Sequence, residues 1–183
     1  LSQPLAWLDR AAVERELGAS ARMFALEVLD LSTSTNTKLM ERAAGGAASG
    51  SVLVAEWQTQ GRGRRGRVWH AAPGAALTFS LLWRFQQGAG ALSGLSLAIG
   101  VAVLRALARA GVEDAGLKWP NDVIWRGRKL AGMLIEMQGE VTGPSAAVIG
   151  LGLNCRLPNN VRERIDQPVV DFAQITGTTP DRN

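Results

Sequence analysis

Residues 117–154 decide the fold class: LKWPNDVIWRGRKLAGMLIEMQGEVTGPSAAVIGLGLN. The apolar runs DVIW, KLAGMLIEM and AAVIGLGLN follow one another there as strands, with a tight RGR turn at 126–128. A doubly wound parallel sheet would need strands that alternate regularly with helices. We therefore expect an α+β fold, with a mixed β-sheet backed by helices.

The chain upstream supplies the remaining strands and helices. SVLVAEW (51–57) and ALTFSLLW (76–83) read as neighbouring strands of one sheet, and MFALEVLDL (23–31) reads as another strand. One helix is expected after the cap residue Asp9, and another after the cap candidates in STSTN. Residues 93–110 are apolar nearly all round, which predicts a helix buried against the sheet.

Length and composition restrict the class of protein. A chain of 183 residues that is 46% hydrophobic fits one globular domain with a real core. No run of about eighteen apolar residues occurs, and the start LSQPLAWLDRAA lacks the regions of a signal peptide, so we expect a cytoplasmic protein. A single cysteine, Cys155, and a single histidine, His70, exclude an internal disulfide and a zinc site, and read as a core thiol and a loop imidazole.

Positive charge is concentrated in one part of the chain. Between Trp57 and Val112 there are seven arginines and no Asp or Glu, so the rest of a chain with net charge +4 carries −3. Four of these arginines lie with three glycines in GRGRRGR, residues 61–67. Guanidinium groups and open backbone amides suit phosphate or carboxylate oxygens. We expect this loop to order around an anionic ligand, with a solvated basic loop or a nonspecific nucleic-acid contact as alternatives.

The loop does not fit the common phosphate-binding motifs. GRGRRG matches the letters of the dinucleotide fingerprint, but a predicted strand follows it and no acidic residue occurs about 20 positions later. A Walker A sequence is absent from the chain. Trp69, two residues after Arg67, either stacks on a purine or packs in the core.

Two more polar stretches are candidates for a site. Lys118 and Lys129 are two of the three lysines in a chain with 17 arginines. Pro120 fixes an extended turn that presents Asn121 and Asp122 at a strand entrance, where they can hold a metal-bound phosphate or orient an amine. A plain turn with two surface lysines is the alternative. STSTN offers hydroxyls and an amide to a polar uncharged ligand, although helix capping explains it equally well.

Taken in order, these stretches resemble the catalytic domain of the biotin protein ligases, the family that attaches biotin to carboxylase carrier proteins. The resemblance covers about residues 24–154 and rests on several separated motifs. They are Ser34-Thr35-Asn36, GRGRRGR (61–67), KWPND (118–122), RKLAGMLIE (128–136) and GLGLN (150–154). The related lipoate ligases share the general fold but are not known for this arginine–glycine run followed by KWPND, so a lipoate-protein ligase is the nearest alternative.

The resemblance implies a fold similar to class II aminoacyl-tRNA synthetases and a reaction in two steps. The biotin carboxylate attacks the α-phosphate of Mg-ATP, which gives biotinoyl-5′-AMP and pyrophosphate. A lysine amine of the acceptor then attacks the mixed anhydride. The implied ligands are ATP, Mg²⁺ carried by ATP, and biotin, and the implied acceptor is the biotin carboxyl carrier domain of acetyl-CoA carboxylase.

The resemblance also assigns residues to these ligands. The ureido ring of biotin is expected at Ser34, Thr35 and Gln58. Asn36 and the backbone around Arg62, Gly63 and Arg64 are expected to close over the ligand. Lys129 is expected at the reacting carboxylate, and Trp69 on adenine. Lys118, Asn121 and Asn154 are expected at the ATP phosphates and magnesium. Asp122 is expected to meet the incoming lysine, and Arg64 and Arg67 to shield the adenylate from water.

Family members usually continue into a small β-barrel domain, and some carry an upstream winged helix for DNA; neither is seen in these 183 residues. The ending TTPDRN reads as the start of a helix, so residues 1–183 are expected to be a catalytic domain from a longer protein. Two copies could pair through a sheet edge, and neither a membrane nor DNA is an expected partner. A basic nucleic-acid-binding module is the alternative from another class, but the chain lacks the spaced aromatic platform of single-strand binders.

Overall fold

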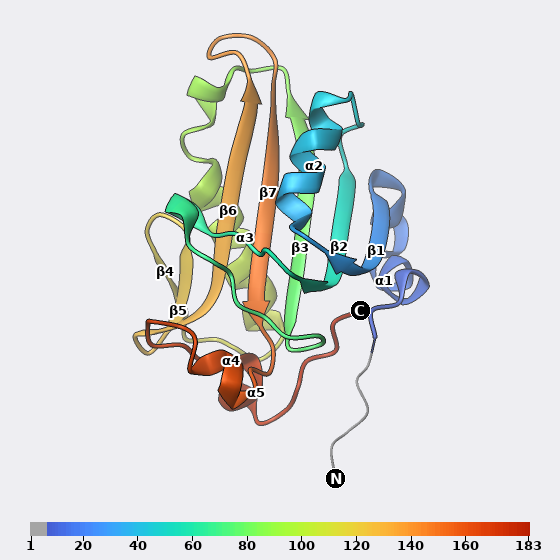
Figure 1. Ribbon diagram of the computed structural model, residues 1–183. Helices are drawn as coiled ribbons and strands as arrows, with labels where there is room; N and C mark the ends of the chain where they lie inside the picture. The colour runs from blue at the N-terminus through green and yellow to red at the C-terminus, as the bar shows by residue number, and fades with distance from the viewer. Residues whose placement is uncertain (1–6) are drawn as a thin grey trace.

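The computed structural model describes residues 7–183 and contains one seven-stranded sheet, in the order β1-β2-β3-β7-β6-β5-β4 (Figure 1). The strands are β1 (Ala25–Ser32), β2 (Ser51–Gln58), β3 (Ala76–Phe85), β4 (Ala115–Lys118), β5 (Asp122–Trp125), β6 (Arg128–Gly139) and β7 (Ser145–Asn154). Only β1 and β2 pair in parallel, and the other neighbours are antiparallel. The predicted mixed sheet and α+β class are confirmed. Residues 1–6, part of the stretch used to argue against a signal peptide, lie outside the described residues.

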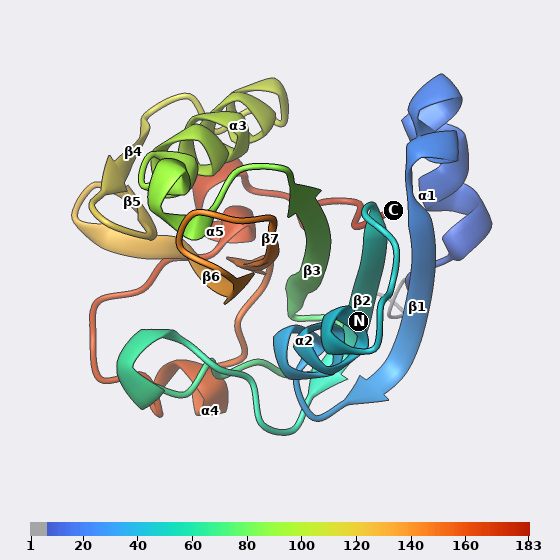
Figure 2. The same ribbon diagram turned by 90° about the horizontal axis from the view of Figure 1, so that it is seen from above.

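Helices cover both faces of this sheet. They are α1 (Arg10–Leu17), α2 (Thr35–Ala44), α3 (Leu95–Arg109), α4 (Asn159–Arg162) and α5 (Phe172–Thr176), with 3₁₀ turns η1 (Gly18–Met23), η2 (Arg64–Gly66) and η3 (Ala89–Leu92). In Figure 2, α2 and the segment that contains η2 lie on one face of the sheet, and α3 lies on the other. We call residues 61–69 the arginine loop.

Capping residues fix where α1 and α2 begin. Asp9 accepts a hydrogen bond from the backbone of Ala12, which confirms the predicted cap, and among the candidates in STSTN it is Ser34 that accepts from the backbone of Thr37. At the other end of α2, Arg84 of β3 donates to two backbone carbonyls, those of Ala43 and Ala47. The start of α2 is therefore held at one end of the sheet face, next to the end of β2.

Apolar side chains attach the helices to the sheet in separate clusters. The cluster beneath α2 comprises Leu39, Ala43, Leu53, Leu82, Ala146 and Val148. The cluster shared with α3 and α5 comprises Leu107, Val112, Val123, Leu130, Ala131, Val170 and Phe172. A third cluster, Leu8, Leu26 and Val54, holds the segment before α1. The alternation of strand side chains between the two faces produces this division.

Helix α3 is less buried than its sequence predicts. It begins at Leu95 after Gly94, not at Ser93, and only Gly100 and Leu107 are buried. Because α3 is an outer layer on a single sheet, one stripe of its surface meets the core and the opposite side, including Leu97 and Val101, is exposed. In the described part of the chain, Ala89–Arg109 is the one helical segment long and apolar enough to span a membrane, a weak criterion that a helix packed in a folded core also meets.

Candidate active site

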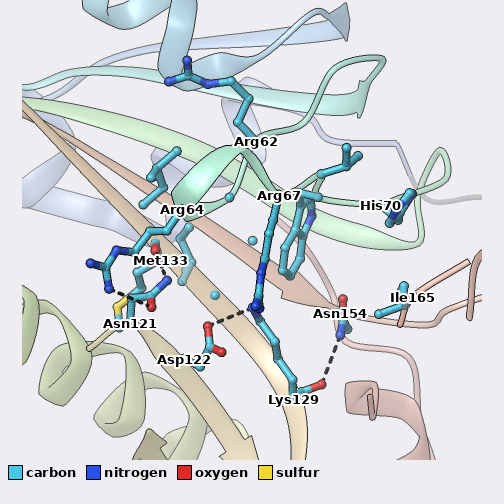
Figure 3. Close-up of a pocket in the computed structure, with 18 of the residues that line it drawn as sticks. Arg62, Arg64, Arg67, His70, Asn121, Asp122, Lys129, Met133, Asn154 and Ile165 are labelled. Carbon is cyan, nitrogen blue, oxygen red and sulfur yellow. Dashed lines mark hydrogen bonds and ion pairs between the residues drawn. The ribbon is translucent and has the colours of Figure 1, made fainter. Parts of the chain in front are cut away.

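A pocket of about 680 Å³ lies on the face of the sheet that carries α2 and the arginine loop (Figure 3). Every residue that the sequence analysis assigned to ligand binding or catalysis lines this pocket. They are Ser34, Thr35, Asn36, Gln58, Arg62, Gly63, Arg64, Arg67, Trp69, Lys118, Asn121, Asp122, Lys129 and Asn154. The fold therefore gathers motifs that are far apart in the sequence, while the roles given to the individual residues stay predictions.

The floor of the pocket is made by glycines of β6 and β7. A Cβ atom at Gly152 would lie 2.4 Å from the Trp69 ring, and one at Gly132 would lie 3.3 Å from the same ring and 3.1 Å from Lys129 Nζ. Glycine is thus needed here because the Trp69 ring lies directly on the strands. The ring nitrogen Nε1 of Trp69 is buried without a hydrogen-bond partner in the described structure, so the indole could still donate to a bound ligand.

The arginine loop has a defined backbone conformation of its own. Gly63 N donates to Arg67 O at 2.7 Å, and Trp69 N donates to Gly61 O at 2.8 Å. Gly66 has φ +74°, and a Cβ at Gly61 would lie 2.6 Å from the Trp69 carbonyl oxygen. Two of the three glycines are therefore needed for the turn itself. The proposed ordering of this loop by an anion stays a prediction.

Lys129 lies inside the pocket in an ion pair with Asp122, at 2.8 Å between Nζ and Oδ1 (Figure 3). The two side chains are 16% and 20% exposed, so the pair is partly shielded from water. Lys129 is also 5.7 Å from the centre of the Trp69 ring. A cation in this position can attract a ligand carboxylate or phosphate that competes with Asp122.

The turn before β5 is anchored by Asn121. Its side chain donates to Met133 O at 2.8 Å, and Met133 N donates to the backbone oxygen of Asn121 at 2.8 Å. Arg64 of the arginine loop reaches Asn121 Oδ1 at 3.5 Å. Residues 119–121 form a turn between β4 and β5, and β5 begins at Asp122, so the predicted turn at a strand entrance is confirmed.

A buried polar cluster lies at the start of α2. Gln58 Oε1 accepts from Thr35 N at 2.8 Å and from Thr35 Oγ1 at 3.2 Å. Ser80 Oγ of β3 lies 2.8 Å from Thr35 Oγ1 and 2.5 Å from Asn36 Oδ1. Ser34 is the helix cap, and it also lines the pocket. The capping and ligand-binding readings of STSTN are therefore compatible.

Residues 164–167 and Val169 line the pocket although no motif indicated them. Lys129 N donates to Pro168 O, and Val170 N donates to Lys129 O, so this segment runs beside the catalytic candidate. Asn154 Nδ2 donates to Lys129 O at 3.3 Å and to Val170 O at 3.1 Å. The Asn154 amide thus joins β7, Lys129 and this segment. Only the tertiary structure shows this arrangement, because the contacts are set by backbone pairing.

The side chains present limit the metal and covalent chemistry of the site. Within residues 7–183, no group of three or more His, Cys, Asp and Glu side chains could hold a metal ion. The acidic residues lining the pocket are Asp122 and Asp166, which fits a magnesium ion that is held mainly by nucleotide phosphates. Burial raises the pKa of the Cys155 thiol to about 11, so this core residue is not a nucleophile at neutral pH.

The fold and the pocket agree with a family assignment. Residues 28–154 match the Biotin/lipoate A/B protein ligase family, and the chain belongs to this family. Among individual relatives, it is 39% identical over 187 aligned positions to the bifunctional ligase/repressor BirA of Salmonella typhimurium, covering all of this chain and 55% of that protein. It is also 39% identical to the biotin–[acetyl-CoA-carboxylase] ligase of Mycobacterium tuberculosis, over 96% of this chain and 65% of that protein.

Solved structures show the same similarity. The biotin protein ligase of Aquifex aeolicus in complex with biotin and ATP superposes with a TM-score of 0.69 and 31% identity, covering 86% of this chain and 63% of that one. The biotin protein ligase of Leishmania major in complex with biotinyl-5-AMP gives a TM-score of 0.61 and 27% identity, over 82% and 64% of the two chains. This chain therefore spans between about half and two thirds of the length of these relatives.

Proposed function

We propose that this chain is the catalytic part of a biotin–[acetyl-CoA-carboxylase] ligase. One observation carries the proposal: the motifs at 34–36, 61–67, 118–122, 128–136 and 150–154, distant in sequence, line a single pocket. The relatives named for biotin ligation, and the structures that hold biotin, ATP or biotinyl-5-AMP, support biotin as the acid. The family as a whole also includes lipoate ligases, so the choice of acid requires an experiment.

In the first step, an oxygen of the biotin carboxylate attacks the α-phosphorus of ATP, and pyrophosphate leaves. Lys129 would exchange its partner Asp122 for the carboxylate and stabilise the charge that develops at the acyl phosphate. The Trp69 ring, fixed by Gly132 and Gly152, would receive the adenine. Mg²⁺ bound to the phosphates would neutralise their charge, and Lys118 and Asn121, which line the pocket, would contact the phosphates.

In the second step, the amine of an acceptor lysine attacks the acyl carbon, and AMP leaves. Asp122, released from Lys129, would orient this amine or accept its proton. Arg64 and Arg67 line the pocket wall and would limit the access of water to the mixed anhydride. The acceptor is the carrier domain of acetyl-CoA carboxylase that the relatives' names indicate. The same ATP-dependent chemistry suits a cytoplasmic location.

A nucleic-acid-binding module is less well supported. The arginines of the acid-free segment are divided between the two faces of the sheet, because four of them lie in the arginine loop and Arg105 and Arg109 lie on α3. The arginine loop borders a concave pocket, whereas single-strand binders expose aromatic platforms along a groove. Binding to DNA at two salt concentrations would reveal any such activity through its salt dependence.

The test of the proposed function is exchange of labelled pyrophosphate into ATP. The chain is expected to catalyse exchange when biotin is added, because the first step needs only this pocket, and to show no exchange with lipoate. Exchange driven by lipoate alone would identify a lipoate ligase. Absence of biotin binding by calorimetry, together with absence of exchange with either biotin or lipoate, would exclude both activities for this chain.

A further inference from the structure

Glu136 ends the RKLAGMLIE motif and connects two parts of the site. It lies on β6, and its side chain is 28% exposed. Its Oε1 accepts from Arg62 Nη2 in an ion pair, and its Oε2 accepts from Asn36 Nδ2 at 3.0 Å. In Figure 3, Arg62 extends away from Arg64, Arg67 and Lys129. One carboxylate thus joins the arginine loop to the start of α2.

This carboxylate fixes the orientation of the Asn36 amide. Asn36 Nδ2 donates both to Glu136 and to Leu134 O, at 3.1 Å, and these two partners can only accept. Turning the amide over would place Asn36 Oδ1 against two acceptors. Its oxygen is therefore directed to Ser80, which lies 2.5 Å away. A Cβ at Gly150 would lie 2.1 Å from this oxygen, so the amide has no room to move toward β7.

The connection continues to the other side of the pocket. Ser80 is 2.8 Å from Thr35 Oγ1, and Thr35 donates to Gln58. Ser80, Thr35 and Asn36 are no more than 4% exposed, so water does not compete strongly for these bonds. An unbroken series of hydrogen bonds runs from Arg62 to Gln58 through four intermediate residues, Glu136, Asn36, Ser80 and Thr35. In this series, Glu136 is the step that joins the loop to the buried cluster.

We propose that Glu136 is a positioning residue that couples the placement of the arginine loop to the binding of biotin at the Thr35–Gln58 cluster. The proposal rests on the proposed function and adds a residue to it. Glu136 has two acceptor oxygens for two donors. An isosteric glutamine has one acceptor and one donor, so its amide nitrogen would face either the Arg62 guanidinium or Asn36 Nδ2, and one of the two bonds is lost.

The first test compares Glu136→Gln with Glu27→Gln, using the whole chain. Glu27 accepts from both Nη atoms of Arg42, in an exposed ion pair that lies outside the pocket lining. Glu136→Gln is expected to raise the Kd for biotin about tenfold or more, the effect of losing one charge-assisted hydrogen bond. Glu27→Gln is expected to change Kd less than about twofold, because exposed pairs contribute little. Both are measured by calorimetry, and urea unfolding confirms that each variant is folded.

The second test measures coupling, which a simple loss of stability would not change. Arg62→Met and Asn36→Ala are made singly and together, first with Glu136 and then with Gln at that position. With Glu136, the changes in the biotin Kd are expected to be non-additive by about threefold or more, although the two side chains share no direct bond. In the Glu136→Gln background they are expected to be additive. If Glu136→Gln does not fold, Arg62→Met, at an exposed loop position, must alone raise Kd about tenfold.

The outcomes separate the two proposals. A wild-type chain that binds no biotin overturns the proposed function, and the coupling role falls with it. A wild-type chain that binds biotin, with unchanged affinity in Glu136→Gln or with additivity in both backgrounds, overturns the coupling role alone.

Discussion

At the scale of single residues, the proposed function assigns Lys129 to the charge that develops in the first step. Lys129→Ala is expected to lower biotin-dependent pyrophosphate exchange about 100-fold or more, in the range observed when one group that stabilises transition-state charge is removed. The lysine that lies outside the pocket lining, Lys38 of α2, provides the control, and Lys38→Ala is expected to leave exchange unchanged. An unchanged rate in a folded Lys129→Ala variant would remove this residue from the mechanism.

Burial of Cys155 predicts how its thiol affects stability as the pH rises and how slowly the thiol reacts in the folded protein. Desolvation raises the pKa of its thiol from 9.0 to about 11 in the folded protein. The neutral thiol is favoured by folding, so its contribution to stability is complete below the unfolded pKa and is lost as the pH rises through the folded pKa. At pH 8 the native thiol is expected to resist dithiobis(nitrobenzoate), whereas the chain in urea reacts at once. Equal rates in the two states would contradict the burial of Cys155.

At the scale of elements, β7 depends on small residues where it passes beneath Trp69. Gly152→Ala is expected to displace the Trp69 ring, because the new Cβ would lie 2.4 Å from it, and to raise the KM for ATP about tenfold or more. Gly116→Ala of β4 is the matched control, since nothing lies within 4 Å of a Cβ there. Circular dichroism is expected to match wild type in both. An unaltered KM in Gly152→Ala would show that Trp69 does not position the nucleotide.

The arginine loop should respond to its ligand as a unit. Four arginines in seven residues repel one another, and Arg62 and Arg64 have the partners Glu136 and Asn121. An adenylate would neutralise more of this charge and restrict the loop. Limited trypsin digestion is therefore expected to cut at residues 62–67 several-fold more slowly when biotin and ATP are present. Cleavage at the same rate with and without these ligands would refute the ordering of the loop.

Helices, strands and motifs were predictable from the sequence where a local pattern of residue types determines them. The prediction that strands 51–57 and 76–83 are neighbours is confirmed, because apolar, β-rich runs identify strands and strands that follow one another in the sequence commonly pair. The pocket residues could be predicted because they belong to motifs with distinctive residue types and spacing. The exposure of Leu97 and Val101 and the position of residues 164–169 depend on which faces of helix and sheet meet, and no local pattern contains that information. Glu136 is the last residue of the RKLAGMLIE motif, but its hydrogen bonds to Asn36 and Arg62 join segments that are far apart in the sequence, so only the tertiary structure reveals them.

At the scale of the whole molecule, the buried carboxylate of Glu56 connects residues near both ends of the described chain to the sheet. Glu56 of β2 pairs with Arg182 at 2.6 Å, and the two side chains are 1% and 5% exposed. Glu56 also accepts from the backbone N–H of Leu8. Nearby, Asp9 N donates to Asn183 Oδ1 at 2.7 Å. Segments that no motif marks are thus fastened to the strand that carries Gln58 into the pocket.

This arrangement predicts unequal effects of removing two arginines. Arg182→Ala leaves the Glu56 carboxylate buried without its cation, so the free energy of unfolding is expected to fall by about 3–5 kcal/mol. Arg42 and Glu27 form an ion pair in which the two side chains are 44% and 43% exposed. Arg42→Ala is therefore expected to lower the free energy of unfolding by at most about 1 kcal/mol. Urea titrations of the two variants measure the difference. Similar losses would mean that water already reaches Glu56, and that the ends of the chain are not held to β2 as a cooperative part of the domain.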